Sequence, residues 1–227
     1  MAKNTKHSSG DENLEVIQNT LGRTEQFIEE NQKSVSIIIG AIIFIIVGYF
    51  AYQKFYVAPL EQEAQTQIFI AQNYFAQDSF QLALDGDGFN DGFIAVADDY
   101  GMTNTGNIAN YYAGISYLRL GKYDEAIDYL KNFDASDEMI STMAIGAIGD
   151  AYVEKDNIEE AISYFKKASE NNPNEFITPI YLMKLGKAYE KLGEKEDALV
   201  TYKKIKTDFV RSNEARKIDK FIERVKM

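Results

Sequence analysis

Residues 114–130 read GISYLRLGKYDEAIDYL, and two later stretches repeat the same pattern of small and aromatic residues. Residues 149–165 read GDAYVEKDNIEEAISYF, and residues 186–202 read GKAYEKLGEKEDALVTY. In each copy a tyrosine follows the first glycine by three residues, an alanine follows by twelve, and a large side chain follows by sixteen. The copies begin 35 and 37 residues apart, a period typical of stacked helical hairpins.

The shared positions have a physical explanation in two packed helices. Glycine and alanine let antiparallel helices approach closely, while the aromatic side chains fill the remaining space. Seven residues after each first glycine stand Gly121, Asp156 and Gly193, where we expect the turn between the two helices. Because one hairpin cannot bury its own apolar face, we predict that the hairpins stack.

This pattern resembles the tetratricopeptide repeat. The resemblance implies an all-α fold, a right-handed α-solenoid of about four hairpins, with three repeats in residues 107–210. A divergent first hairpin is expected in residues 59–106, where Ala71, Tyr74 and Ala83 keep the spacing. Its second helix is interrupted by a loop and is expected to resume over residues 92–100. Ser212 can cap a final helix, and we predict that residues 211–227 cover the end of the solenoid.

Residues 35–51 read VSIIIGAIIFIIVGYFA and contain no charged residue. Eleven of them are Val, Ile or Phe, which together contribute about −3 to −6 kcal/mol towards membrane insertion. We therefore predict one transmembrane helix over residues 34–54, followed by an aromatic belt and ended by Pro59. Two alternatives are a cleaved signal peptide and a buried core helix. The long acidic stretch before the apolar run argues against a cleaved signal peptide. The charged residues on both sides of the run argue against a buried core helix.

Basic residues are unequally distributed about this span. Lys3, Lys6, Arg23 and Lys33 precede it, whereas the 64 residues after Lys54 contain no Lys or Arg. The positive-inside rule therefore predicts a cytoplasmic tail of residues 1–33 and a C-terminal domain outside the cytoplasm. In a Gram-negative bacterium the anchor lies in the inner membrane and the domain in the periplasm. Leu14 to Ile28 should form an amphipathic helix, which either lies on the membrane or binds a cytoplasmic partner.

Several classes of function do not fit the composition. A formal net charge of −11 argues against nucleic-acid binding. The chain has no cysteine and one histidine, His7, so thiolate metal sites and most nucleophile–base pairs are excluded. We expect no catalytic residue, cofactor, metal or small-molecule substrate. The acidic stretch 85–92 could suggest calcium, but Phe89 falls where an oxygen ligand belongs, which favours a plain loop.

Residues on the inner face of each first helix are candidates for a partner-binding groove. The aligned positions are Ile108, Tyr111, Ile115 and Leu118, then Met143, Gly146, Asp150 and Val153, and finally Ile180, Met183, Lys187 and Glu190. Such a groove is apolar with a mixed-charge end, which suits an extended apolar segment or a partner helix. The alternative is that several of these residues only pack between hairpins.

The order of tail, anchor and external repeat array resembles the ancillary subunit of the bacterial SecYEG translocon. Residues 68–227 are also similar to uncharacterised membrane-anchored repeat proteins of Bacteroidota. The translocon resemblance implies a scaffolding or chaperone-like role in the periplasm. Its expected partners are translocon subunits, a membrane-anchored prolyl isomerase or unfolded secreted chains. Two alternatives are an adaptor in another envelope assembly or secretion machine, and an organelle import receptor with a cytosolic array.

Overall fold

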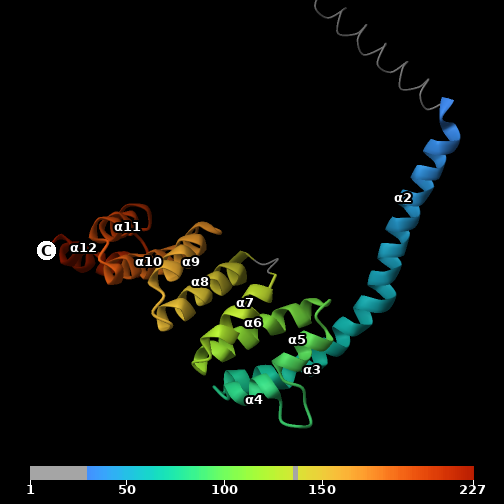
Figure 1. The fold of residues 1–227 in the computed structure, drawn as a ribbon, viewed down its shortest axis with the longest axis horizontal. Helices are drawn as coiled ribbons and strands as arrows, with labels where there is room; N and C mark the ends of the chain where they lie inside the picture. Colours follow the sequence, from blue (N-terminus) through green and yellow to red (C-terminus); the bar gives the residue numbers. More distant parts are fainter. Residues whose placement is uncertain (1–29, 135–137) are drawn as a thin grey trace, which may run out of the picture. The chain divides into compact units, whose positions relative to one another are not determined.

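The structure, a computed structural model, describes residues 30–134 and 138–227, and every regular element in these ranges is a helix (Figure 1). The chain divides into two compact units, residues 1–56 and residues 57–227. The amphipathic helix expected between Leu14 and Ile28 lies outside the described residues.

The first unit contains the apolar helix α2 (Gln32–Tyr52). None of its residues is buried, although it carries a long run of isoleucine, valine and phenylalanine. A helix in a protein core would hide these side chains, whereas a helix that crosses a bilayer presents them to lipid. Within the part of the chain that is described, this is the one helical stretch long and apolar enough to span a membrane.

The prediction that this helix ends at Pro59 is wrong. A single π turn, η1 (Gln53–Val57), follows α2, and α3 (Ala58–Ala76) follows η1 without a break. The π turn interrupts the regular α-type hydrogen bonding just before the proline. Pro59 therefore lies in the first turn of a new α segment, where its missing N–H has the smallest cost.

The second unit is a stack of antiparallel helical hairpins, which confirms the all-α solenoid (Figure 1). After α3 its elements are α4 (Phe80–Asp85), α5 (Phe93–Asp99), α6 (Asn104–Arg119), α7 (Tyr123–Asn132), α8 (Glu138–Glu154), α9 (Ile158–Glu170), α10 (Thr178–Leu192), α11 (Lys195–Asp208), η2 (Ala215–Lys217) and α12 (Ile218–Lys226). Helices α6/α7, α8/α9 and α10/α11 form the three repeats, and α3 with α4 and α5 forms the first hairpin.

The glycines of the repeat pattern lie where two helices of one hairpin touch. A Cβ placed on Gly114 would lie 2.6 Å from Leu130, and one placed on Gly149 would lie 2.6 Å from the ring of Phe165. In the third repeat a Cβ on Gly186 would overlap Tyr202. The two sequence positions separated by sixteen residues are therefore in contact in every repeat.

The turns of all four hairpins share one backbone conformation. Positive φ angles occur at Gly121 (73°), Asp156 (58°) and Gly193 (86°), the three aligned turn positions. Asp78, seven residues after Ala71 in the first hairpin, has a φ of 57°. Glycine adopts this left-handed conformation without strain, whereas aspartate does so at a modest cost. The first hairpin is therefore built on the same plan as the other three.

A polar loop divides the second helix of the first hairpin into α4 and α5. Within this loop the Asp87 carboxylate accepts hydrogen bonds from the backbone N–H of Phe89 (2.9 Å) and of Asn90 (2.7 Å). It also accepts bonds from the Asn90 amide (2.9 Å) and the Tyr74 hydroxyl (2.8 Å). These bonds, led by that of the Asn90 side chain, hold the pKa of Asp87 far below its usual value. Both carboxylate oxygens are thus engaged within the loop itself.

Aromatic side chains join the first hairpin to the second. Phe75 of α3, Phe93 of α5 and Tyr112 of α6 have ring centroids 5.1 to 6.1 Å apart, and the rings of Phe93 and Tyr112 are stacked. Phe93 is completely buried. Rings packed at these distances add stabilisation beyond the area that they bury. The same interface also contains a polar contact, because the Glu61 carboxylate of α3 accepts hydrogen bonds from the Thr105 N–H (3.1 Å) and hydroxyl (2.7 Å).

Helix α12 covers the last hairpin, as its amphipathic pattern predicts. The Ser212 hydroxyl oxygen accepts a hydrogen bond from the Ala215 N–H (3.1 Å), at the first residue of η2, whose N-cap residue is Glu214. Ile218, Ile222 and Val225 are buried in one cluster with the side chains of α10 and α11. The opposite face of α12 is exposed and charged.

A candidate partner-binding groove

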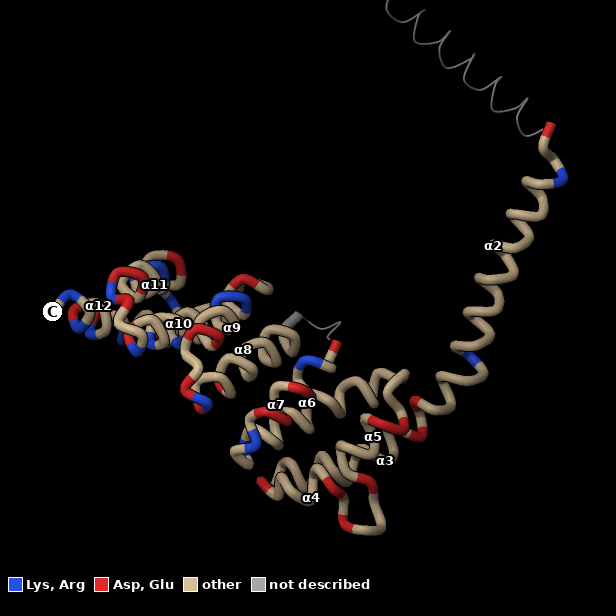
Figure 2. Tube along the Cα trace, in the orientation of Figure 1, with Lys and Arg blue, Asp and Glu red and all other residues tan. Residues whose placement is uncertain are grey.

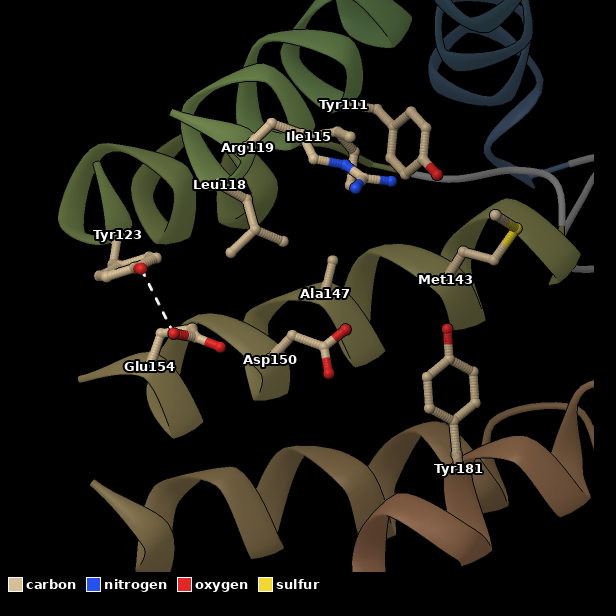
Figure 3. Close-up of a pocket in the computed structure, with 10 residues that line it drawn as sticks. All are labelled: Tyr111, Ile115, Leu118, Arg119, Tyr123, Met143, Ala147, Asp150, Glu154 and Tyr181. Carbon is tan, nitrogen blue, oxygen red and sulfur yellow. Dashed lines mark hydrogen bonds between the residues drawn. The ribbon is translucent and has the colours of Figure 1, made fainter. Parts of the chain in front are cut away.

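A cavity of about 570 Å³ lies between the first helices of two successive repeats (Figure 3). Helices α6 and α8 form its two sides, and one side chain each comes from α7 and α10. Its lining consists of Tyr111, Ile115, Leu118, Arg119, Tyr123, Met143, Ala147, Asp150, Glu154 and Tyr181. Seven of these ten residues are apolar or aromatic and three are charged, a mixture common in binding sites.

Tyr181 forms a buried part of the cavity wall. Its side chain is only 7% exposed and lies against Gly146, where a Cβ would overlap the tyrosine ring. Figure 3 shows its hydroxyl directed towards Met143. Burial first, and then the negative charge of Asp150, raises the pKa of the Tyr181 hydroxyl, so the group stays protonated and can donate a hydrogen bond.

Three charged residues lie along the cavity. The Asp150 carboxylate accepts two hydrogen bonds from the Lys184 ammonium, at 2.6 and 2.8 Å. Glu154 accepts one from the Tyr123 hydroxyl at 3.4 Å. The exposed Arg119 forms no ion pair with any residue that the structure describes. Its guanidinium can therefore bind a carboxylate or carbonyl oxygen of a ligand.

A second cavity, of about 210 Å³, occupies the equivalent place one repeat later, between α8 and α10. It is lined by Asp150, Val153, Ile158, Phe165, Lys184, Lys187, Ala188 and Lys191. Lys184 is paired with Asp150, and Lys191 with Asp156 at 2.6 Å. Lys187 is exposed and has no ion-pair partner among residues 30–134 and 138–227. The groove thus changes from aromatic to basic between the two cavities.

The structure brings part of the predicted groove together. Tyr111, Ile115, Leu118, Met143 and Asp150 line the first cavity. Val153 and Lys187 line the second, which also includes Asp150.

The other predicted residues lie elsewhere. Ile180 lines a separate hollow beside the α9–α10 and α11–η2 loops. Ile108 packs against the apolar cluster of the first hairpin.

Met183 and Glu190 line neither of the two groove cavities. Met183 is 9% exposed and belongs to the core of the last hairpin. Glu190 is bound by Arg224 of α12 and by Tyr202. Both side chains are covered because α12 packs on the last hairpin, in the position that the first helix of a further repeat would take.

Five lining residues are absent from the predicted set: Arg119, Tyr123, Ala147, Glu154 and Tyr181. On α8 the lining residues are Met143, Ala147, Asp150 and Glu154, at steps of four, three and four, so they lie on one face of the helix. The predicted set contained only two residues of this face, Met143 and Asp150. The glycine at position 146 indicates the contact with Tyr181, because a glycine on an inward face leaves room for a large side chain from the next repeat.

Comparison with known families supports the same repeats. Residues 109–135 and 181–212 match one family model described as tetratricopeptide repeat, and residues 144–175 match a second model with that description. A search of curated proteins found no match. The chain therefore contains three tetratricopeptide repeats, which indicate a scaffold for protein–protein interaction.

Proposed function

We propose that this protein is a single-pass membrane-anchored scaffold that holds a partner protein in the groove formed by α6, α8 and α10. The observation that carries the proposal is the cavity of about 570 Å³, whose apolar and aromatic side chains lie beside Arg119, which forms no ion pair with the described residues. Its half-open, mixed lining suits a peptide segment or helix of another protein.

The groove also indicates the chemistry of the segment that it binds. Tyr111, Ile115 and Met143 in the first cavity favour a large apolar side chain, whose burial contributes about 1.5–3 kcal/mol. Lys187 in the second cavity favours a carboxylate, whose exposed ion pair contributes at most about 1 kcal/mol. The partner segment therefore carries an apolar side chain followed by an acidic one, and the apolar contact supplies most of the affinity.

Several features support a place for this scaffold in a bacterial envelope. The span of α2 anchors the chain, and the distribution of Lys and Arg about it favours a cytoplasmic N-terminus and a periplasmic array. The likeness in organisation to the ancillary translocon subunit favours the Sec translocon as the site of action. A translocon subunit, a membrane-anchored prolyl isomerase or an unfolded secreted chain is then the partner.

Affinity capture from mild detergent tests the groove and the partner together. We expect the full chain to recover SecY or a membrane-anchored prolyl isomerase, and Met143→Glu to lose it. Val200→Glu, at a 67% exposed position on α11 outside the two groove cavities, is the matched control and should recover the partner. Capture that survives Met143→Glu would remove the groove from the proposal. Recovery of a different envelope machine would favour the adaptor alternative.

Orientation is tested separately by fusing alkaline phosphatase after Met227. The enzyme is active only outside the cytoplasm, so we expect an active fusion. An inactive fusion would favour the second candidate, an import receptor with a cytosolic array.

A further inference from the structure

The charges of the repeat array are segregated along the stack (Figure 2). In the described ranges all six ion pairs join residues between Asp124 and Lys226. Residues 57–118 contain eight acidic residues and no Lys or Arg. The first hairpin and the helix after it therefore have no cation of their own to neutralise these carboxylates.

Most of the acidic side chains at this end are open to solvent. Two of the carboxylates form hydrogen bonds within the protein: Glu61 accepts them from Thr105, and Asp87 accepts them from residues of its own loop. Asp78, Asp98 and Asp99 are exposed and form none of the ion pairs found in the described part of the chain. The first hairpin thus presents a negative surface.

The last hairpin and its covering helix present the opposite charge. Eight exposed cations between the start of α10 and the end of α12 have no ion-pair partner within residues 30–134 and 138–227: Lys187, Lys195, Lys203, Lys204, Arg211, Arg216, Lys217 and Lys220. Residues 201–227 hold nine Lys or Arg against four acids. The ammonium of Lys220 lies 4.9 Å from the centre of the Phe221 ring, and that of Lys187 lies 5.8 Å from it.

These two surfaces belong to opposite ends of one stack. The α6/α7 and α8/α9 hairpins separate α3–α5 from α10–α12. The acidic and basic ends of one array are thus held apart by the hairpins between them. Two copies of the chain, in contrast, offer each other complementary charge at both ends.

We propose that two copies of this protein pair antiparallel, with the first hairpin of each facing η2 and α12 of the other. This arrangement has two-fold symmetry, matches both charged ends at once and closes on itself. Two anchors can share one membrane when the two-fold axis is perpendicular to it. Like charges would meet in a parallel pair, and this repulsion selects the antiparallel one.

The pair depends on salt and on the membrane. Its contacts are exposed charges, which are screened as the ionic strength rises. Anchoring in one bilayer raises the effective concentration of the copies and so favours pairing. None of the residues named in the two charged surfaces lines the cavity between α6 and α8, and only Lys187 also lines the second cavity.

A charge exchange tests the pairing in full-length protein, by light scattering in detergent and by cross-linking in vesicles. We expect the dissociation constant of the wild-type pair to rise at least about tenfold between about 50 and 500 mM salt. D98K/D99K halves the net negative charge of residues 57–118, K217E/K220E removes most of the net positive charge of residues 201–227, and each variant alone should pair more weakly than the wild type. A mixture of the two variants should form the mixed pair, and this result also shows that both variants are folded.

The absence of cysteine in the sequence allows a second test. Chains with Asp99→Cys and chains with Lys217→Cys, mixed and treated with a bismaleimide, should give cross-linked dimers. Chains with Glu159→Cys, at an exposed site on α9, should not cross-link to Lys217→Cys chains. A wild-type monomer at low salt overturns the proposal, as does pairing that the charge reversals leave unchanged. Binding of the basic end to anionic vesicles without dimers would assign that surface to lipid instead.

Discussion

Arg224 of α12 binds Glu190 of α10 through two hydrogen bonds, from Nε at 2.8 Å and from Nη2 at 2.7 Å. Tyr202 of α11 donates its hydroxyl to the same carboxylate. Desolvation acts to raise the pKa of Glu190, but the hydrogen bonds from Arg224 and Tyr202 outweigh it and lower the pKa. One carboxylate thus joins three helices at the end of the array.

We predict that Arg224→Met destabilises the protein at neutral pH by about 1 kcal/mol, or about 2–4 °C in Tm, because the pair is partly exposed. The folded-state pKa of Glu190 lies below its ordinary value of 4.5. The contribution is therefore present above pH 4.5 and is lost as the pH falls through the folded-state pKa. Thermal melts at pH 7 and at about pH 3 measure the difference.

Lys226→Met is the matched control, because Lys226 pairs only with Glu223 on the exposed surface of the same helix. It should change Tm by less than Arg224→Met at either pH. A loss for Arg224→Met that is equal at both pH values would show that lost packing, rather than charge, explains it.

We predict that Gly149→Ala destabilises the second repeat by about 1–3 kcal/mol, despite alanine's better helix propensity. The new Cβ would lie 2.6 Å from the Phe165 ring, so the two helices must separate. Chemical denaturation measures the loss. Gly40→Ala, where no atom lies within 4 Å of the new Cβ, should have no such cost.

A second substitution isolates this mechanism. Phe165→Leu in the Gly149→Ala background removes the ring that clashes, and part of the lost stability should return. Additive losses in the double variant would contradict steric contact as the cause.

We predict that Asp78→Gly stabilises the first hairpin by about 0.5–1 kcal/mol. Asp78 has a φ of 57°, and the aligned turn residues Gly121 and Gly193 are glycines. The reverse change, Gly121→Asp, should destabilise by a similar amount, since its φ is 73°. Denaturant midpoints measure both changes, and a destabilised Asp78→Gly variant would count against the backbone explanation.

We predict that Met143→Ala weakens partner binding more than Lys187→Ala does. The first change removes apolar contact and should cost about tenfold or more in affinity. The second removes an exposed charge and should cost about two- to fivefold. Only the Lys187 effect should shrink as salt rises, because only that contact is screened. Titration of the captured partner at low and high salt checks both statements, and equal salt dependence of the two variants would contradict them.

The sequence predicted the fold well because its periodic positions have a direct physical meaning. Gly149 and Phe165 are sixteen residues apart since they touch across one hairpin, and Asp156 marks the turn between them. The position of Pro59 could not be interpreted correctly, because a π turn leaves no signature in the sequence. The helix therefore continues where a proline normally ends it.

The groove was predicted less completely, for a related reason. A prediction from aligned positions assigns the same role to the same position in every repeat. The environment of a side chain, however, depends on the element that follows its repeat. Tyr111 and Met143 are followed by further repeats and line the cavity, but Glu190 is followed by α12 and binds Arg224. Tyr181 lines the cavity from the next repeat, a contact that one repeat read alone cannot show.

The ion pairs of the array also have a consequence for the way in which it comes apart. Four ion pairs join neighbouring repeats, or the last repeat and α12, rather than the two helices of one hairpin. They are Asp124–Lys155, Asp150–Lys184, Asp156–Lys191 and Glu190–Arg224. The first hairpin is instead joined to the second by the rings of Phe75, Phe93 and Tyr112 and by the hydrogen bonds that Glu61 accepts from Thr105. Salt screens the ion pairs and leaves the contact between the aromatic rings intact. High salt therefore weakens the joints between Asp124 and Arg224 more than the joint between the first two hairpins.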